Sequence, residues 1–439
     1  MSIRKSGVIR HSDFLTWGII IIFFIFIVSD SIKIFSTDGY ILFDLIKKGI
    51  GGIITMFFML IMIRDRNLFM PIPIFSLIAL FLVAVLSSFK NIDRSGLAAL
   101  QFFFTFGFFI QVLLFSNISF TARHLILISN IFVWISFPVA AYGILEVALD
   151  FPSLSSLAGG IADDAVLRGD LKSATSIFLH PGSFAWLISS SACICFCRWI
   201  VGNEKLSGII FAVFVAALIV AMRKKTLIAL FIGILVILWM TRQSIANWMK
   251  SLFLMTGLGV CIFLIFPSYF LTMLNSLRFE EVLLGEFTPR LKLAVASLTL
   301  AVENFPLGTG LSTFGSATSV DVYSPLYGEL GLSNHYGMTS SDPRFLMDTF
   351  WPMLLAEIGF LGVLFYLSCL IGIGRRLFIF ANSCNSKDFK VIAFLAVMLF
   401  CKSFVESVST PIFSKLTYSI FIAFYCGGAL SIIRMQSAR

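Results

Sequence analysis

The chain has 439 residues, of which 59% are hydrophobic and 13% are charged. This composition excludes a single soluble globular core, because so few polar groups cannot cover its surface. The formal net charge of +9 arises from 32 Lys and Arg residues against 23 Asp and Glu residues. Its distribution along the chain, described below, indicates a membrane topology and gives no sign of nucleic-acid binding.

Apolar runs recur along the chain at lengths typical of membrane spans. A helix needs ~20 mainly apolar residues to cross a bilayer. We therefore predict an all-α, polytopic integral membrane protein that forms a single transmembrane domain over residues 1–439, with about twelve transmembrane helices. The predicted spans lie near 14–28, 41–63, 71–88, 96–115, 123–149, 180–200, 206–222, 224–241, 249–270, 349–371, 389–405 and 416–434.

The segments between these spans alternate in charge. If the N-terminus is cytoplasmic, the inner segments hold 16 of the 32 Lys and Arg residues but 4 of the 23 acidic residues. This asymmetry is the positive-inside pattern of membrane proteins. It places two longer loops, near 150–179 and 271–347, on the outer side of the membrane.

The shorter outer loop ends in the sequence FLHPGSFA, residues 178–185. Pro is favoured at the first position of a helix, so a span is expected to begin at Pro181. His180 then lies at the outer membrane face. Two interpretations of His180 remain open at this point, a capping residue of the helix and a residue of the substrate site.

Residues 206–240 would measure ~50 Å as one helix, which is too long for a ~30 Å bilayer core. They are expected to form two spans joined by a tight turn near 222–226. Arg223, Lys224 and Lys225 then lie on the outer side, against the usual charge bias. Three cations in such a position favour an anion-binding site, with a phospholipid headgroup as the simpler alternative ligand.

The longer outer loop contains a predicted amphipathic helix near 289–303. Thr288 and Pro289 form a typical helix start, and apolar residues then alternate with Arg290, Lys292 and other polar residues. Such a helix is expected to lie along the outer membrane interface. Arg290 and Lys292 in its first turn suit an anion, because a helix N-terminus already attracts negative charge.

The stretch 288–362 also carries a family resemblance. Arg290 is followed by the amphipathic helix, by ENFPLGTG at 303–310, by a polar loop and by EIGFLG at 357–362. This order resembles the superfamily of O-antigen polymerases and O-antigen ligases. In the ligases the last block begins with His, whereas Asp348 stands at that position here, so the chain is more similar to the polymerase branch.

The resemblance implies an enzyme of the bacterial inner membrane whose active site faces the periplasm. The implied substrate is undecaprenyl pyrophosphate bearing an oligosaccharide repeat unit, which is joined to a second such unit without a metal or another cofactor. The implied partners are membrane lipids and a polysaccharide chain-length regulator protein, and no nucleic acid. The expected pyrophosphate-binding residues are Arg223, Arg290, Lys224, Lys225 and Lys292.

Transfer to a sugar hydroxyl requires a base, and two candidates stand in the longer outer loop and at its end. Asp348 is the first candidate and His335 the second, since a carboxylate or an imidazole can take the proton of the hydroxyl. Asp348 could equally cap the helix that follows it. Glu357 is expected to orient a cation or a sugar, or to pair internally, and Arg168 and His180 are further candidates for the substrate site.

Two further pairs of residues are expected to have structural roles. Gly359 and Gly362 are expected to allow close helix packing, and Lys402 and Glu406 are expected to form an ion pair near a helix end.

Two alternative functions remain open, an O-antigen ligase that transfers the glycan to lipid A core and a flippase or other transporter for lipid-linked oligosaccharides. A transporter would be expected to carry charged residues near mid-membrane, whereas the cations here gather at the outer ends of spans.

Overall fold

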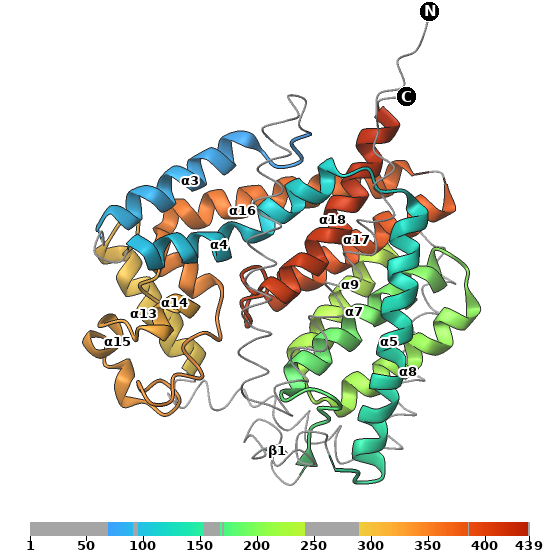
Figure 1. Ribbon diagram of the computed structural model, residues 1–439, viewed down its shortest axis with the longest axis horizontal. Helices are drawn as coiled ribbons and strands as arrows, with labels where there is room; N and C mark the ends of the chain where they lie inside the picture. The colour runs from blue at the N-terminus through green and yellow to red at the C-terminus, as the bar shows by residue number, and fades with distance from the viewer. Residues whose placement is uncertain are drawn as a thin grey trace, which may run out of the picture.

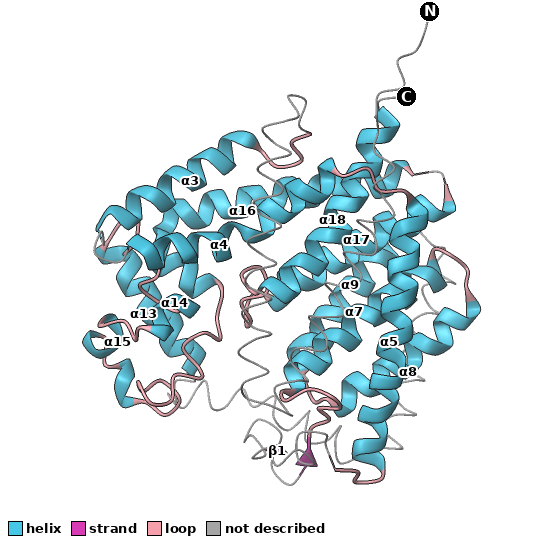
Figure 2. Cartoon of the chain, in the orientation of Figure 1, coloured by secondary structure: helices cyan, strands magenta, loops and turns pink. Residues whose placement is uncertain are grey.

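The computed structural model describes residues 69–90, 95–152, 167–168, 171–241, 289–384 and 386–437. The predicted spans near 14–28, 41–63 and 249–270 lie outside the described residues, as do most of the loop 150–179 and the start of the loop 271–347. The fold class is all-α, as predicted, with twelve α-helices in the described part (Figure 2). Strands β1 (Leu167–Arg168) and β2 (Leu171–Lys172) form a two-residue antiparallel pair.

Each predicted span that falls within the described residues corresponds to a helix. These helices are α3 (Ile74–Ser88), α4 (Ser95–Asn117), α5 (Ala122–Ala148), α7 (Pro181–Ile200), α8 (Lys205–Val220), α9 (Lys224–Met240), α16 (Trp351–Ser383), α17 (Lys387–Glu406) and α18 (Leu416–Ser437). Among them α4, α5, α7, α16 and α18 are long and apolar enough to cross a membrane, which fits a multi-pass membrane protein. Helix α16 extends well beyond its predicted end near 371.

The shorter helices of the outer loop are α13 (Pro289–Glu303), α14 (Ala317–Asp321), α15 (Leu326–Glu329) and a 3₁₀ turn at Leu332–Asn334. Helix α13 has the bounds that the sequence predicts. Its Leu293 and Leu300 are buried, and it packs against α16. Its opposite face is an exposed apolar stripe of Leu291, Val295, Leu298 and Val302. An exposed stripe of this kind suits a helix that lies in the membrane interface, as predicted.

The helices pack in pairs, with α4 along α18, α7 along α8, α9 along α17, and α3 and α13 along α16. Helices α3, α4 and α13 gather on one side of the molecule and α5, α7, α8 and α9 on the other, with α17 and α18 between them (Figure 1). A layer of aromatic rings joins the start of α16 to its neighbours. The Phe350 ring lies 5.4 Å from that of Tyr366 and 5.7 Å from that of Phe413, and Phe109 of α4 lies 4.7 Å from Tyr366.

Hydrogen bonds at the two ends of the bundle agree with the predicted alternation of segments. At the end expected to be inner, Asn117 bonds to the backbone of Phe69 and to Arg434. At the opposite end, Trp351 donates to Ser407 at 2.9 Å, and Lys90 donates to Asn304 at 3.3 Å. The candidate site lies at this second end.

Candidate functional site

The first element of the site is an ion pair between Arg290 and Asp348. Arg290 is the second residue of α13, and Asp348 precedes α16. The Arg290 Nη2 atom lies 3.0 Å from Asp348 Oδ2, and the two side chains are 48% and 39% exposed. The pair is therefore open to a solute, and the structure joins two residues to which the sequence assigned separate roles.

The alternative role of Asp348 as a helix cap is wrong. Helix α16 begins at Trp351 and its N-cap is Phe350, which makes no side-chain cap hydrogen bond. The buried Phe350 ring packs against the rings of Trp351 and Phe413. The Asp348 carboxylate is left to face Arg290, as its pairing shows.

The turn between α8 and α9 supplies three further cations. The predicted division into two helices is confirmed, since α8 ends at Val220 and α9 begins at Lys224, with Met222 at a φ of 53° between them. Arg223, Lys224 and Lys225 are all half-buried at this turn.

Lys225 links this turn to the rest of the site. Its Nζ donates to the carbonyl oxygen of Ser409 at 3.2 Å and also contacts Thr410 Oγ1. It interacts electrostatically with Arg290, Asp348 and Arg223. Arg290 of α13 therefore lies near Arg223 and Lys225 of the α8–α9 turn, which their separation in the sequence did not guarantee.

His180 and Arg223 form a second contact in this region. His180 is the N-cap of α7, and its Nδ1 accepts a hydrogen bond from Gly182 N at 2.9 Å. A neutral imidazole has one acceptor nitrogen, so its proton then lies on Nε2. That atom is 3.3 Å from Arg223 Nη2. An oxygen does not fit between two nitrogens this close, but an anionic oxygen beside the pair can accept from both N–H groups. His180 can thus serve both as a cap and as an anion ligand.

His335 and Lys292 form a third contact. The Lys292 Nζ atom lies 3.0 Å from Nδ1 and 3.2 Å from Nε2 of His335, and both side chains are half-buried. An ammonium group has only donors, so it can bond to His335 only through an unprotonated ring nitrogen. His335, the second candidate base, is therefore held beside a candidate pyrophosphate ligand, as Asp348 is.

Glu357 lies away from these cations and organises the loop beneath them. Its side chain is fully buried in α16. Its Oε1 accepts hydrogen bonds from Thr313 N at 3.0 Å, Phe314 N at 3.3 Å and Ser316 Oγ at 2.6 Å. Of the roles that the sequence left open for Glu357, internal pairing is the one that the structure describes.

The loop held by Glu357 also docks on α16 through two glycines. Gly359 interrupts α16 with a φ of 65°. A Cβ atom there would lie 2.3 Å from the carbonyl oxygen of Pro306, and one at Gly308 would lie 2.5 Å from that of Ala356. Close backbone contact of this kind is possible only for Gly. The close approach expected at Gly359 is therefore to a loop and not to another helix.

Gly362 lies close to a residue of its own helix. A Cβ atom at Gly362 would meet Ile358 of the same helix at 2.4 Å. The predicted role of Gly362 in contact between helices stays a prediction. The short distance arises next to the break at Gly359, where α16 changes direction.

A scan against protein-family models and a search of curated proteins each found no match for this chain. The similarity to the O-antigen polymerases therefore depends on the motif residues themselves, and the site must be judged by its geometry.

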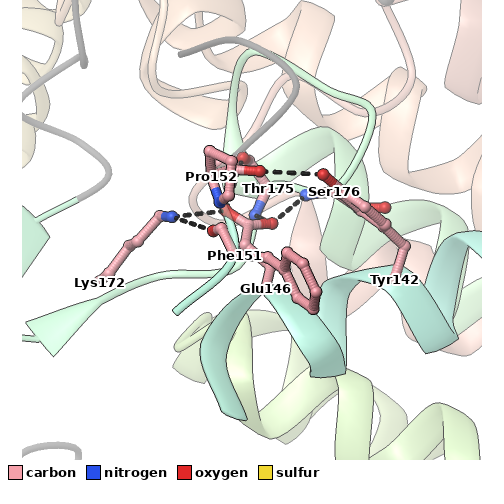
Figure 3. Close-up of polar contacts among 7 residues, drawn as sticks. All are labelled: Tyr142, Glu146, Phe151, Pro152, Lys172, Thr175 and Ser176. Atoms are coloured by element: carbon pink, nitrogen blue, oxygen red, sulfur yellow. Dashed lines mark hydrogen bonds and ion pairs between the residues drawn. The ribbon is translucent and has the colours of Figure 1, made fainter. Parts of the chain in front are cut away.

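Glu146 is a supporting residue to which the sequence analysis gave no role. It is fully buried near the end of α5. Its carboxylate accepts from Ser176 N at 2.7 Å and from Thr175 N at 3.1 Å, with Lys172 Nζ at 3.6 Å (Figure 3). The available signal was a carboxylate inside an apolar run, which normally has a specific partner.

The segment held by Glu146 leads directly to His180 and also touches the α8–α9 turn. The amide of Ala174 donates to the carbonyl oxygen of Val220 at 3.0 Å. The same short segment is thus fixed to α5 at one point and to the end of α8 at another. This arrangement sets His180 and Arg223 in position relative to each other.

Lys402 and Glu406 form the expected ion pair, with Nζ and Oε2 3.0 Å apart and both side chains almost fully buried. Lys402 also lies 6.0 Å from the centre of the Trp186 ring. Lys225 interacts electrostatically with Glu406, which connects this pair to the site. For Arg168 the structure describes the backbone in β1, so its predicted role in the substrate site stays a prediction.

Proposed function

We propose that this protein is a polysaccharide polymerase of the O-antigen polymerase type. It transfers a glycan from one undecaprenyl-pyrophosphate carrier to the sugar hydroxyl of a second lipid-linked repeat unit at the periplasmic face. The observation that carries the proposal is the gathering of Arg223, Lys225 and Arg290, which interact electrostatically, with His180 in contact with Arg223.

The reaction needs stabilisation of a leaving group. The bond between the anomeric carbon and the pyrophosphate oxygen breaks, and its electron pair leaves with the pyrophosphate. Negative charge therefore grows on the leaving oxygen as the transition state is reached. Fixed cations and N–H donors stabilise this charge more than they stabilise the ground state. Arg223 and Arg290 suit the task best, because a guanidinium group matches two phosphate oxygens at once.

The reaction also needs a proton acceptor. The acceptor hydroxyl oxygen forms the new bond to the anomeric carbon and loses its proton. The Asp348 carboxylate is bound to Arg290 in the structure. A pyrophosphate that takes over Arg290 releases Asp348, whose oxygens are then free to accept the proton. Donor binding and activation of the base are coupled through this exchange. His335 stands in the same relation to Lys292.

The test is polymerisation by the full-length protein in liposomes, with undecaprenyl-pyrophosphate-linked repeat units as both donor and acceptor. We expect products at whole multiples of the repeat unit and the release of one undecaprenyl pyrophosphate for each bond formed. The matched control is a protein with both Arg223→Ala and Arg290→Ala. Products that form only after lipid A core is added would identify a ligase. Movement of the lipid across the bilayer without lengthening would identify a flippase.

A further inference from the structure

An apolar cavity of 510 Å³ lies between α3 and α4. Its volume falls within the ~300–1,000 Å³ range of ligand pockets. Its walls include Phe81, Phe89, Phe102 and Phe103, and Leu311 of the outer loop closes one side. The polar atoms around it contribute little to its surface, which suits a hydrocarbon.

The cavity is tied to the loop that docks on α16. The amide of Leu311 donates to Ser88 Oγ at 3.3 Å at the end of α3. Two residues later, Lys90 Nζ donates to Asn304 Oδ1 at 3.3 Å and to the carbonyl oxygen of Gly308 at 3.4 Å. The mouth of the cavity therefore meets the C-terminal end of α13.

The exposed stripe of α13 connects this end to the cation site. Leu291 follows Arg290, and Val295, Leu298 and Val302 continue along the same face, each between 36% and 61% exposed. Phe305, 71% exposed, continues the stripe beyond the helix. From Arg290 to Glu303 the helix rises ~20 Å. The stripe thus extends from the anion site to the end of α13, and the loop that follows α13 contacts the end of α3 beside the cavity.

We infer that this stripe and the cavity hold the isoprenoid chain of the polyprenyl-pyrophosphate substrate, a step that rests on the proposed function. The pyrophosphate lies at Arg290, the chain follows the stripe of α13, and its distal part enters the cavity between α3 and α4. The ligand has a charged head and a long apolar chain. The surface has cations at one end and an apolar cavity at the other, so the two match in chemistry and in order.

The structure offers matched substitutions for a test. Val85 and Ala99 line the cavity, whereas the neighbouring Leu86 and Leu100 are exposed and do not line it. Val85→Trp and Ala99→Trp narrow the cavity, and Leu86→Trp and Leu100→Trp place the same ring outside it. Since Ala99 is exposed, its replacement forces no change in the protein core.

The experiment measures binding of two probes to the full-length protein in phosphatidylcholine nanodiscs. The first is undecaprenyl pyrophosphate with a photoreactive group near the end of its chain, and the second is geranyl pyrophosphate, whose chain is too short to reach the cavity. We expect the long probe to crosslink to α3 and α4 in the wild type. Narrowing the cavity by the space of roughly two methylene groups should weaken its binding about tenfold. Geranyl pyrophosphate should bind all five proteins equally.

Three outcomes would overturn the inference: crosslinks spread evenly over the lipid-facing helices, equal effects of the cavity substitutions and their neighbours, or displacement of the long probe by phosphatidylglycerol. The last result would mean that the cavity takes any membrane lipid. The assay needs no glycan transfer, so it separates the two proposals. If the probes bind as expected but the protein does not polymerise, the site for the isoprenoid chain is supported and the polymerase function is refuted. If the protein polymerises but Ala99→Trp binds the long probe as the wild type does, the polymerase function is supported and the site for the chain is refuted.

Discussion

Arg290 and Asp348 are separated by 58 positions in the sequence, yet their Nη2 and Oδ2 atoms lie 3.0 Å apart, at the end of the bundle that is predicted to face outward. An ion pair with this exposure is worth about 0–1 kcal/mol to folding. Its two residues can therefore be replaced with little loss of folded protein, and their effects on activity can be measured directly.

The first prediction concerns the two arginines. Arg223→Ala and Arg290→Ala should each remove long polymer at normal protein levels, because each removes a charge-assisted contact to the leaving group. Such a contact is worth ~1.5–3 kcal/mol, or roughly ten- to more than hundredfold in rate. Lys at either position should restore part of the activity, since it keeps the positive charge but cannot donate the paired hydrogen bonds of the planar guanidinium group. The measurement is the chain-length ladder of the polysaccharide. A wild-type ladder in both Ala variants would refute the assignment.

The second prediction concerns the base. Because Asp348 caps no helix, Asp348→Asn and Asp348→Ala should fold equally well. Both should be slower by about 10²–10⁴-fold, since neither can accept the proton of the hydroxyl. The assay is polymerisation at equal folded protein, with Asp348→His and His335→Ala for comparison. An active Asn variant beside an inactive His335→Ala variant would move the role to His335.

The third prediction concerns the contact between Gly308 and Gly359. Gly359→Ala should lower the thermal midpoint in detergent, because its methyl group meets the Pro306 carbonyl and its φ of 65° is unfavourable for Ala. A loss of at least ~1–3 kcal/mol is expected. The control is Gly328→Ala in α15, where a Cβ atom meets nothing within 4 Å. Equal midpoints for the two variants would show that the loop does not depend on this contact.

The fourth prediction concerns Glu146. Glu146→Ala leaves the amides of Thr175 and Ser176 without their acceptor, so the segment before His180 should lose its fixed position. Binding of inorganic pyrophosphate, measured by calorimetry, should weaken about tenfold, which corresponds to ~1.4 kcal/mol. Glu329→Ala, which removes an exposed carboxylate in α15, should bind as the wild type does. Unchanged binding of pyrophosphate in Glu146→Ala would show that the hydrogen bonds of Glu146 do not affect the anion site.

The fifth prediction concerns topology. The α8–α9 turn and the loop 280–342 should face the periplasm. In a cysteine-free protein, Lys224→Cys and Tyr336→Cys should react with an impermeant thiol reagent in intact cells, and Ser386→Cys should react only after the membrane is opened. If Lys224→Cys does not react with the reagent in intact cells, the α8–α9 turn does not face the periplasm and the proposed periplasmic anion site is refuted.

Local sequence signals predicted much of the fold. The start and the amphipathic period of α13 are encoded within fifteen residues, and the division between α8 and α9 follows from helix length alone. The break at Gly359 was missed, because its backbone conformation depends on a loop more than fifty residues away. The start of α16 was predicted near 349, whereas the helix begins at Trp351.

The candidate site was predicted as a set of residues but not as a set of contacts. Composition and span parity indicated which cations lie at the outer end. Nothing in the sequence indicated that Arg290 meets Asp348, that Lys292 meets His335 or that Arg223 meets His180. These pairings depend on how α7, α9, α13 and α16 pack, which is a property of the whole bundle.

The pairing of Arg290 with Asp348 has a consequence for which solutes the site admits. Arg290 is already paired with a carboxylate, so an anion must displace that carboxylate in order to bind to Arg290. Chloride or sulfate gains little by displacing the carboxylate, because one attraction is exchanged for another of similar strength. A pyrophosphate carries more charge and can engage several cations in one event, so its gain exceeds the loss. If the site binds a pyrophosphate, as proposed, the ion pair would thus favour a polyvalent head group over small anions, by a margin no larger than the weak pair itself.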